Sequence, residues 1–446
     1  MPSRQRAIIN FLDEVSACRM HGFRLSLKGD VLAEGYWAPF TPQEPHRLYS
    51  VSKSVTSLAI GILAGQGRIR LDDPICVYFP DLVDADTPVM LREVTIRHML
   101  RMSTCFDRAM YSIDMDDWTR PFFRGVPTHP AGTLFHYDTS ASQVMCALVE
   151  KLSGQDILSF MEENLFRPIG MDGPKKWLKD KAGTSQGGTG LLMTLKDFSL
   201  LADFCMSDGR GLIPADYLKS ATSLQIMTQE RTAPEEKHGY GYQFWMMRKG
   251  FAMYGMGGQM AMCLPEQQLS LCTTADTILS SVGVQPLYDA FFRHLDGIEA
   301  LEDNPADKAE LAARLCDLRC PALTPAFSCK DTLRIDLVDS ALPFTALTIR
   351  PDEVLFHLPG GDFSLPYGQG AWADGIFPTT TERCITSGGW MTPSRFCLHC
   401  EVKDNFINAL EMAVGFDGNR ASVRLSSSLW ELVSGWSGLS WGYACS

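Results

Sequence analysis

The spacing of apolar residues switches between helical and alternating along this chain, and the order of these switches constrains the fold more than any other feature. The pattern predicts a helix, a hairpin, a long helix, a largely helical stretch, short strands and a closing helix, at residues 1–20, 23–36, 50–66, 80–200, 244–273 and 287–295. A long helical insert between two groups of strands indicates an α+β domain.

Capping residues predict two helix starts within the helical stretch. Ser153 is followed three residues later by Asp156, and Thr194 is followed in the same way by Asp197. A hydroxyl residue with an acid at this spacing is close to a capping box. We therefore expect helices to begin at Ser153 and at Thr194.

A change of composition predicts a second domain. The stretch Glu299–Lys308 is acidic and polar and contains Pro305, as a domain boundary often does. Beyond it the apolar residues mostly alternate, as in Phe396 to Val402, which is typical of half-buried strands. We expect an α+β domain at residues 1–298 and a C-terminal antiparallel sheet or barrel, of a lipocalin-like kind, at residues 306–446.

Composition and charge exclude several functional classes. With 45% hydrophobic and 21% charged residues, the chain of 446 residues can bury a full core. A net charge of -12 argues against nucleic acid or an anionic membrane as its main partner, because both bind clustered Lys and Arg. A small-molecule substrate fits this charge better.

The chain also lacks the sequence signals of secretion and of membrane insertion. The short apolar patch near the N-terminus runs into Asp13 and Glu14, which a secretory signal does not tolerate. No segment approaches the run of about 18 apolar residues that spans a bilayer. We expect a cytoplasmic protein whose 14 cysteines are reduced thiols.

The strongest local candidate for chemistry is Ser50-Val51-Ser52-Lys53, at the start of the predicted helix at 50–66. A spacing of three places the Ser50 hydroxyl and the Lys53 amine on one helix face, within hydrogen-bonding reach. The positive end of the helix favours an oxyanion there and disfavours a protonated lysine. The pair could supply a nucleophile and its base, although Ser50 could also be an ordinary helix cap.

Six segments in order resemble the serine β-lactamase and penicillin-binding-protein family, in its class C-like esterase and amidase branch. They are the nucleophile helix with its continuation (48–61 and 71–75), "TIRHMLRM" (95–102), "PAGTLFHYDT" (130–139), "FRPIGM" (166–171), "GGTGL" (187–191) and "YGMGGQ" (254–259). The resemblance covers about residues 20–295 and implies the penicillin-recognising fold, with an antiparallel sheet and helices.

The resemblance implies roles for individual residues. Ser50 would be the nucleophile, Lys53 its base and Tyr137 a second proton-transfer residue, while the backbone N–H groups of Ser50 and Met256 would bind the oxyanion. Substrate-binding positions would be Thr139, Tyr254, Gly255, Gly257 and Gln259. The implied reaction is acyl transfer from a small ester, amide or other acyl donor through a Ser50 ester, with no cofactor.

Two departures from the family pattern affect the expected substrate. Thr139 stands where penicillin-binding members have an asparagine, so the amide that would hold a β-lactam side chain is missing. Tyr254 and Met256 stand in the motif that is otherwise Lys-Thr-Gly, so the cation and hydroxyl that would bind a β-lactam carboxylate are missing too. An esterase, amidase or acyltransferase is therefore expected rather than a β-lactamase.

Two other functions remain open at this point. A non-catalytic binding protein could keep the fold without turnover. Alternatively, Gly183-Thr184-Ser185-Gln186-Gly187 fits the nucleophile elbow of α/β-hydrolases, but an elbow follows a buried strand, and the charged segment 177–182 before it does not suit one.

No metal site is expected. Cys397 and Cys400 lie in an alternating strand, where a separation of three sends side chains to opposite faces. Asp114, Asp116 and Asp117 form an acidic cluster without the glycine and final glutamate of a calcium loop. Surface or core roles explain these residues better than a metal site does.

Overall fold

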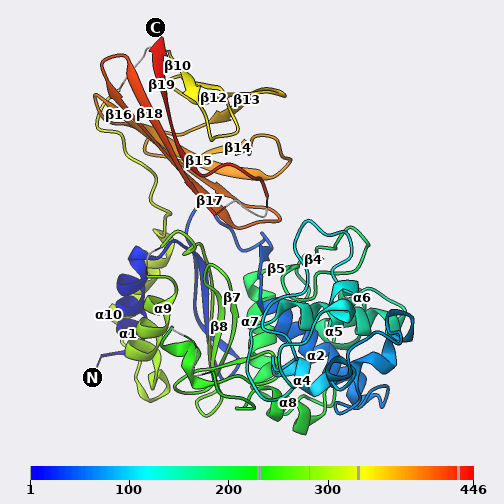
Figure 1. Cartoon of the computed structure of the whole chain (residues 1–446). Helices are drawn as coiled ribbons and strands as arrows, with labels where there is room; N and C mark the ends of the chain where they lie inside the picture. Colours follow the sequence, from blue (N-terminus) through cyan, green and yellow to red (C-terminus); the bar gives the residue numbers. More distant parts are fainter. Residues whose placement is uncertain are drawn as a thin grey trace. The chain divides into compact units, whose positions relative to one another are not determined.

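The computed structural model of the chain (Figure 1) describes residues 2–228, 231, 233–280, 282–328, 332–428 and 432–445. The chain forms two compact units. The first consists of Met1–Ala275 with Val284–Leu318, and the second of Asp276–Gly283 with Arg319–Ser446.

A six-stranded sheet forms the framework of the first unit, with the strand order β2-β1-β9-β8-β7-β6 and antiparallel pairing throughout. Its strands are β1 (Met20–Leu27), β2 (Asp30–Tyr36), β6 (Trp245–Met246), β7 (Phe251–Gly255), β8 (Gln259–Leu264) and β9 (Leu269–Ala275). All residues of β8 and β9 are buried, because helices cover both faces of the sheet.

Helices from both ends of the unit lie on one face of this sheet, namely α1 (Arg4–Glu14), α9 (Gln285–Ala290) and α10 (Pro305–Cys316) (Figure 1). On that face Phe11 of α1 meets Phe23 of β1, with ring centroids 6.1 Å apart. The opposite face carries α7 (Leu195–Cys205), where the Ser199 and Ser26 hydroxyls lie 3.2 Å apart. Arg6 pairs with Asp307 at 2.5 Å, so an ion pair joins α1 to α10.

The predicted hairpin and the predicted long helix are confirmed. Lys28 and Gly29 form the turn between β1 and β2 with positive φ angles of 55° and 85°. Helix α2 covers Val51–Gly65, and Gly67 follows it with a φ of 69°. Glycine favours this left-handed conformation because it has no Cβ, so it suits the position after a helix end.

One of the two predicted helix starts is confirmed and the other is wrong. Thr194 caps α7, since its side chain accepts a hydrogen bond from the Asp197 N–H. Ser153 is instead the last residue of α5 (Thr139–Ser153), which Gly154 ends with a left-handed φ of 73°. Asp156, expected at the third position of the new helix, is itself the cap of α6 (Ile157–Met161).

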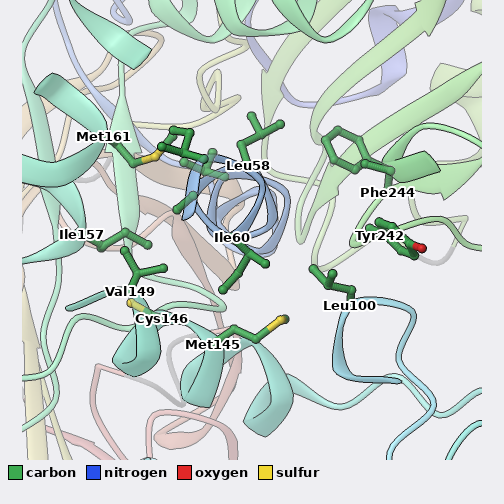
Figure 2. Packing of buried hydrophobic residues seen from close by; sticks show 14 of the residues in the cluster. Leu58, Ile60, Leu100, Met145, Cys146, Val149, Ile157, Met161, Tyr242 and Phe244 are labelled. Carbon is green, nitrogen blue, oxygen red and sulfur yellow. The ribbon is translucent and has the colours of Figure 1, made fainter. Parts of the chain in front are cut away.

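The helical part of the first unit packs around α2, which is buried from Val51 to Leu63. Figure 2 shows Leu58 and Ile60 of α2 surrounded by side chains of α5, of α6 and of the segment with Tyr242 and Phe244. The remaining elements of this part are α3 (Val89–Arg92), α4 (Ile96–Leu100), α8 (Ala215–Ala221) and a small sheet of β3 (His46–Arg47), β5 (Leu191–Met193) and β4 (Lys175–Trp177). The predicted α+β architecture is confirmed.

The second unit contains a nearly closed antiparallel sheet of ten strands, which confirms the predicted C-terminal barrel-like architecture. Their order is β13-β12-β11-β10-β19-β18-β17-β16-β15-β14. The strands are β10 (Leu333–Asp339), β11 (Ala346–Ile349), β12 (Glu353–Leu358), β13 (Gly361–Pro366), β14 (Ala373–Ile376), β15 (Arg383–Thr392), β16 (Arg395–Val402), β17 (Asn408–Asp417), β18 (Arg420–Ser427) and β19 (Gly438–Cys445). Its interior is packed with apolar side chains, among them Phe344, Phe356 and Trp436.

The cysteines that the structure describes are all free thiols, and Cys329 lies outside the described residues. Among those residues, no helix has both the length and the apolar character needed to cross a bilayer.

The packing around α2 leads to a prediction about stability. Leu58→Ala should lower the free energy of unfolding by about 2–5 kcal/mol, because it removes a fully buried side chain and leaves a cavity. Val77→Ala, at a position that is 60% exposed, should change it by no more than about 0.5 kcal/mol. Urea unfolding of both variants measures this, and equal effects would contradict the packing described.

Candidate active site

The Ser50 hydroxyl is left available by the way α2 begins. Ser50 has helical backbone angles at the N-cap position, but its side chain makes no capping hydrogen bond. Tyr49 immediately before it has a φ of 46°, an uncommon value for a tyrosine, and its buried ring is held under the Arg47 guanidinium. The turn thus presents Ser50 half-buried at the positive end of the helix, and the alternative of an ordinary cap does not hold.

The Lys53 amine lies beside this hydroxyl in the interior. Lys53 Nζ donates to Ser50 Oγ at 3.0 Å and to the Gly188 carbonyl at 2.8 Å, and the side chain is 1% exposed. A buried donor needs acceptor oxygens nearby, and Ser50 Oγ and the Gly188 carbonyl provide them. The spacing of three in the sequence has brought a hydroxyl and a buried amine into direct contact.

Tyr137 completes the cluster from a distant part of the sequence. Its ring lies 5.0 Å from Lys53 Nζ and stacks on Trp245, and its hydroxyl makes a hydrogen bond with Ser50. Burial raises the pKa of Tyr137 above its ordinary value, and the hydrogen bond with Ser50 offsets only part of this rise. The phenol is therefore neutral at physiological pH and can donate its proton.

Asp138 fixes the position of Tyr137, which immediately precedes it. The buried carboxylate accepts from the Ser140 N–H at 2.8 Å and so caps α5, whose first turn begins directly after Tyr137. Burial raises the pKa of Asp138 to about 6, while its hydrogen bonds with Ser140 act in the opposite direction.

The end of β7 forms another edge of the site, beside the turn before Ser50. A Cβ on Gly255 would overlap the Leu48 carbonyl oxygen, so only glycine lets this strand approach the turn before Ser50. Tyr254 and Met256 flank Gly255, and both are half-buried. Burial raises the pKa of Tyr254 to about 12, with a further contribution from the charge of Glu236.

The three other substrate-binding positions that the family resemblance implies lie in two places: Thr139 is beside Gly188, whereas Gly257 and Gln259 are at the turn between β7 and β8. Thr139 faces the turn at Gly188, where a Cβ would overlap the Thr139 methyl group and crowd the Lys53 amine. Gln259 is fully buried, and its amide donates to the Ala275 carbonyl at 2.5 Å. Gly257 is buried beside it, with a φ of 84° in the turn between β7 and β8.

Several residues near the site were not identified from the sequence. Trp245 stacks on Tyr137. The Arg231 guanidinium in turn lies over the Trp245 ring, 5.8 Å from its centroid. Arg231 also forms an ion pair with Glu236 at 2.6 Å, and the charges of both act on Tyr137 and Tyr254. These residues lie far along the chain from the motif that contains Tyr137, so the sequence offered no local signal for them.

The alternative nucleophile, Ser185, has a different environment. It lies in the loop between β4 and β5, so neither a buried strand leading into it nor a helix following it is present. Its Oγ is buried and makes no hydrogen bond to any described residue, so no base is positioned to take its proton. The geometry required of a nucleophile elbow is absent from this part of the described chain.

A metal centre is not formed by the residues that the structure describes, since no group of three His, Cys, Asp or Glu side chains gathers there. Cys400 is buried inside the barrel, whereas Cys397 points from the other face of β16, as alternation predicts.

The burial of Asp138 predicts a pH dependence of stability. Because its pKa is raised in the folded protein, the folded state binds a proton more tightly than the unfolded chain, and the free energy of unfolding falls as pH rises from about 4 to about 7. Asp138→Asn keeps the helix cap without the charge. Its stability relative to the wild type should therefore rise by up to about 3 kcal/mol over this range.

Urea unfolding at pH 4, 5, 6 and 7 measures this difference for Asp138→Asn and for Asp81→Asn, an exposed control. A difference that stays constant with pH for Asp138→Asn would show that its carboxyl group does not titrate as described.

Comparison with known proteins places most of the first unit in a known family. The sequence profile of the Beta-lactamase family matches residues 23–276, which contain Ser50, Lys53, Tyr137 and the end of β7. The 6-aminohexanoate-dimer hydrolase of Paenarthrobacter ureafaciens is 23% identical over 304 residues, which cover 62% of this chain and 75% of that protein.

Solved structures show the same fold at lower identity. EstCE1, described as a hydrolase with promiscuous acyltransferase activity, superposes with a TM-score of 0.52 at 16% identity over 65% of this chain and 99% of its own. SurE superposes with a TM-score of 0.54 at 16% identity over 99% of both chains. The resemblance first noted in the motifs is confirmed, and the chain belongs to the Beta-lactamase family, among hydrolases related to β-lactamases and penicillin-binding proteins.

Proposed function

We propose that this protein is a serine hydrolase that forms an acyl-enzyme at Ser50 from small ester or amide substrates. The observation that carries the proposal is the 3.0 Å contact between the Ser50 hydroxyl and the amine of a buried lysine. A serine hydroxyl is a weak nucleophile until a base takes its proton, and a desolvated lysine amine is such a base.

The proposed proton path uses the three side chains of the cluster. As Ser50 Oγ attacks the acyl carbonyl, its proton passes to the neutral amine of Lys53. The phenol of Tyr137 gives its proton to the leaving group, and the Lys53 ammonium returns a proton to the tyrosine. The second half of the reaction reverses these transfers with the acceptor in place of the leaving group, so the free enzyme is regenerated.

The oxyanion of this reaction would be stabilised by two backbone N–H groups. The N–H of Ser50 precedes the first turn of α2 and so has no partner within that helix. The N–H of Met256 follows Gly255, where the strand approaches the Ser50 turn closely. Donors fixed in this way need no reorganisation as charge develops. Gln259 would then support the β7–β8 turn from inside rather than touch the substrate.

The family and its members support the proposed substrate class. The hydrolase of Paenarthrobacter ureafaciens acts on a 6-aminohexanoate dimer by its name, and EstCE1 has acyltransferase activity by its description. We infer that small esters and amides are acyl donors here, and that water or a small alcohol or amine is the acceptor.

A substrate panel with an active-site label tests this function. Esters of p-nitrophenol and small amides are assayed with and without competing alcohols and amines, alongside labelling by a fluorophosphonate. Turnover and labelling should be lost in Ser50→Ala and kept in Ser185→Ala. Labelling without turnover of any substrate would favour a binding protein. Loss of labelling in Ser185→Ala alone would show that Ser185, in the motif that resembles a nucleophile elbow, is the nucleophile.

Because Ser50, Lys53 and Tyr137 share one proton path, the decreases in kcat that their substitutions cause should not add. Ser50→Ala, Lys53→Ala and Tyr137→Phe should each lower kcat by about 10³-fold or more, and the double variant Ser50→Ala/Lys53→Ala should lose no more than Ser50→Ala alone. Steady-state kinetics on the best ester measures this. A Lys53→Ala enzyme with nearly normal kcat would exclude Lys53 as the base.

The absent recognition groups predict poor hydrolysis of β-lactams. Thr139 offers no amide to a β-lactam side chain, and Tyr254 and Met256 offer neither a cation nor the usual hydroxyl to its carboxylate. Each polar group of a bound substrate that is left without a partner costs about 1–3 kcal/mol, which lowers kcat/KM by about 10- to 100-fold. Nitrocefin hydrolysis is compared with the best p-nitrophenyl ester, and equal kcat/KM values would refute this specificity.

A further inference from the structure

The last strand of the barrel-like sheet turns its large side chains outward. In β19 the positions that face the interior are Gly438, Ser440, Gly442 and Ala444. Leu439, Trp441 and Tyr443 alternate with them and are 60%, 47% and 43% exposed. A strand normally buries its apolar side chains, so three exposed ones in a row on one face indicate a surface for interaction.

A basic hollow adjoins this apolar row on the outside of the sheet. It has a volume of about 610 Å³ and spreads over β16, β17 and β18, with Arg395, Arg420 and Arg424 around it and Leu439 at its edge. In the antiparallel register, Arg395 lies opposite Gly415 and Gly415 opposite Ser422, so small residues form the floor between the arginines. A Cβ built on Gly415 would meet nothing within 4 Å, which shows that the floor is open.

The side chains of these arginines are exposed and make no ion pair or hydrogen bond with any residue that the structure describes. Asp417 lines the hollow opposite Arg420 in the register and partly balances it. Arg395 and Arg424 lie on strands two apart and are offset by two residues along the strand, so their Cα atoms are about 12 Å apart. Uncompensated arginines are unusual on a chain whose net charge is -12, and they favour anionic groups by charge complementarity.

We propose that this outer face of β16 to β19 is a docking site for an acidic segment of another protein that carries both carboxylates and apolar side chains. Carboxylates of the segment pair with Arg395 and Arg424 over Gly415, and its apolar side chains cover Leu439, Trp441 and Tyr443. Arginine and aromatic residues are the types that dominate protein–protein binding energies. The proposal concerns the second unit alone and does not rest on the chemistry proposed for Ser50.

Protein fits this surface better than single-stranded nucleic acid does. Bases bind to aromatic rings by stacking. The Trp441 and Tyr443 rings instead meet edge to face at 71°, which gives no common plane for consecutive bases. The exposed Leu439 also favours a partner with apolar side chains over a phosphate backbone.

Fluorescence anisotropy of the full chain with two synthetic peptides tests the proposal. One fluorescein-labelled peptide of about twelve residues interleaves glutamate, leucine and serine, and the other has glutamine in place of each glutamate; extended, either spans the hollow. The glutamate peptide should bind saturably and at least about tenfold more tightly than the glutamine peptide.

Paired variants locate the binding. Arg395→Gln/Arg424→Gln should weaken binding of the glutamate peptide by about tenfold or more, whereas Arg350→Gln/Arg383→Gln, which alters ion-paired arginines of the same unit, should not. Gly415→Leu fills the hollow and should abolish binding, whereas Gly360→Leu, at another glycine with open space, should leave it unchanged. Trp441→Ala should weaken both peptides alike.

Circular dichroism and thermal unfolding check that each variant is folded. Absence of saturable binding below about 1 mM, or equal binding by the variants and their controls, would overturn the proposal. It would also fail if a single-stranded oligonucleotide displaced the peptide and bound more tightly than it, or if Arg395→Gln/Arg424→Gln dissociated an oligomer of this chain without changing peptide binding.

Discussion

The contact between the Lys53 amine and the Ser50 hydroxyl is the interaction on which the rest of the site depends. A lysine that is 1% exposed must satisfy its amine with nearby oxygen atoms, and here Ser50 Oγ and the Gly188 carbonyl accept from it. The same packing that hides Lys53 holds its amine against the Ser50 hydroxyl, which makes it a candidate base. The same arrangement thus gives the buried amine its hydrogen-bond acceptors and places it for the proposed chemistry.

That arrangement requires close approach of three segments that are distant in the sequence. Gly188 brings its carbonyl to Lys53 because it has no Cβ to strike Thr139, and Gly255 brings β7 to the turn before Ser50 for the same reason. Tyr137 reaches Ser50 because the buried Asp138 caps α5 immediately after it. The large core around α2 holds these segments in place.

The sequence predicted the features that depend on local spacing and missed those that depend on tertiary contact. The Ser50–Lys53 pair follows from one helix turn, and the hairpin at residues 23–36 follows from alternation and a glycine turn. The helix start at Ser153 was wrong because Gly154, in a left-handed conformation, ends the preceding helix there. Trp245 gave no local signal, since its contact with Tyr137 joins residues more than one hundred positions apart.

The most direct test of the account is to locate the acyl group on the enzyme itself. The protein is mixed with an excess of a p-nitrophenyl ester and quenched in acid within the first turnovers, and its intact mass and peptide masses are measured. The account predicts one acyl group per chain, on the peptide that contains Ser50, and none in Ser50→Ala. An acyl group on another residue, or an unmodified chain during active turnover, would contradict it.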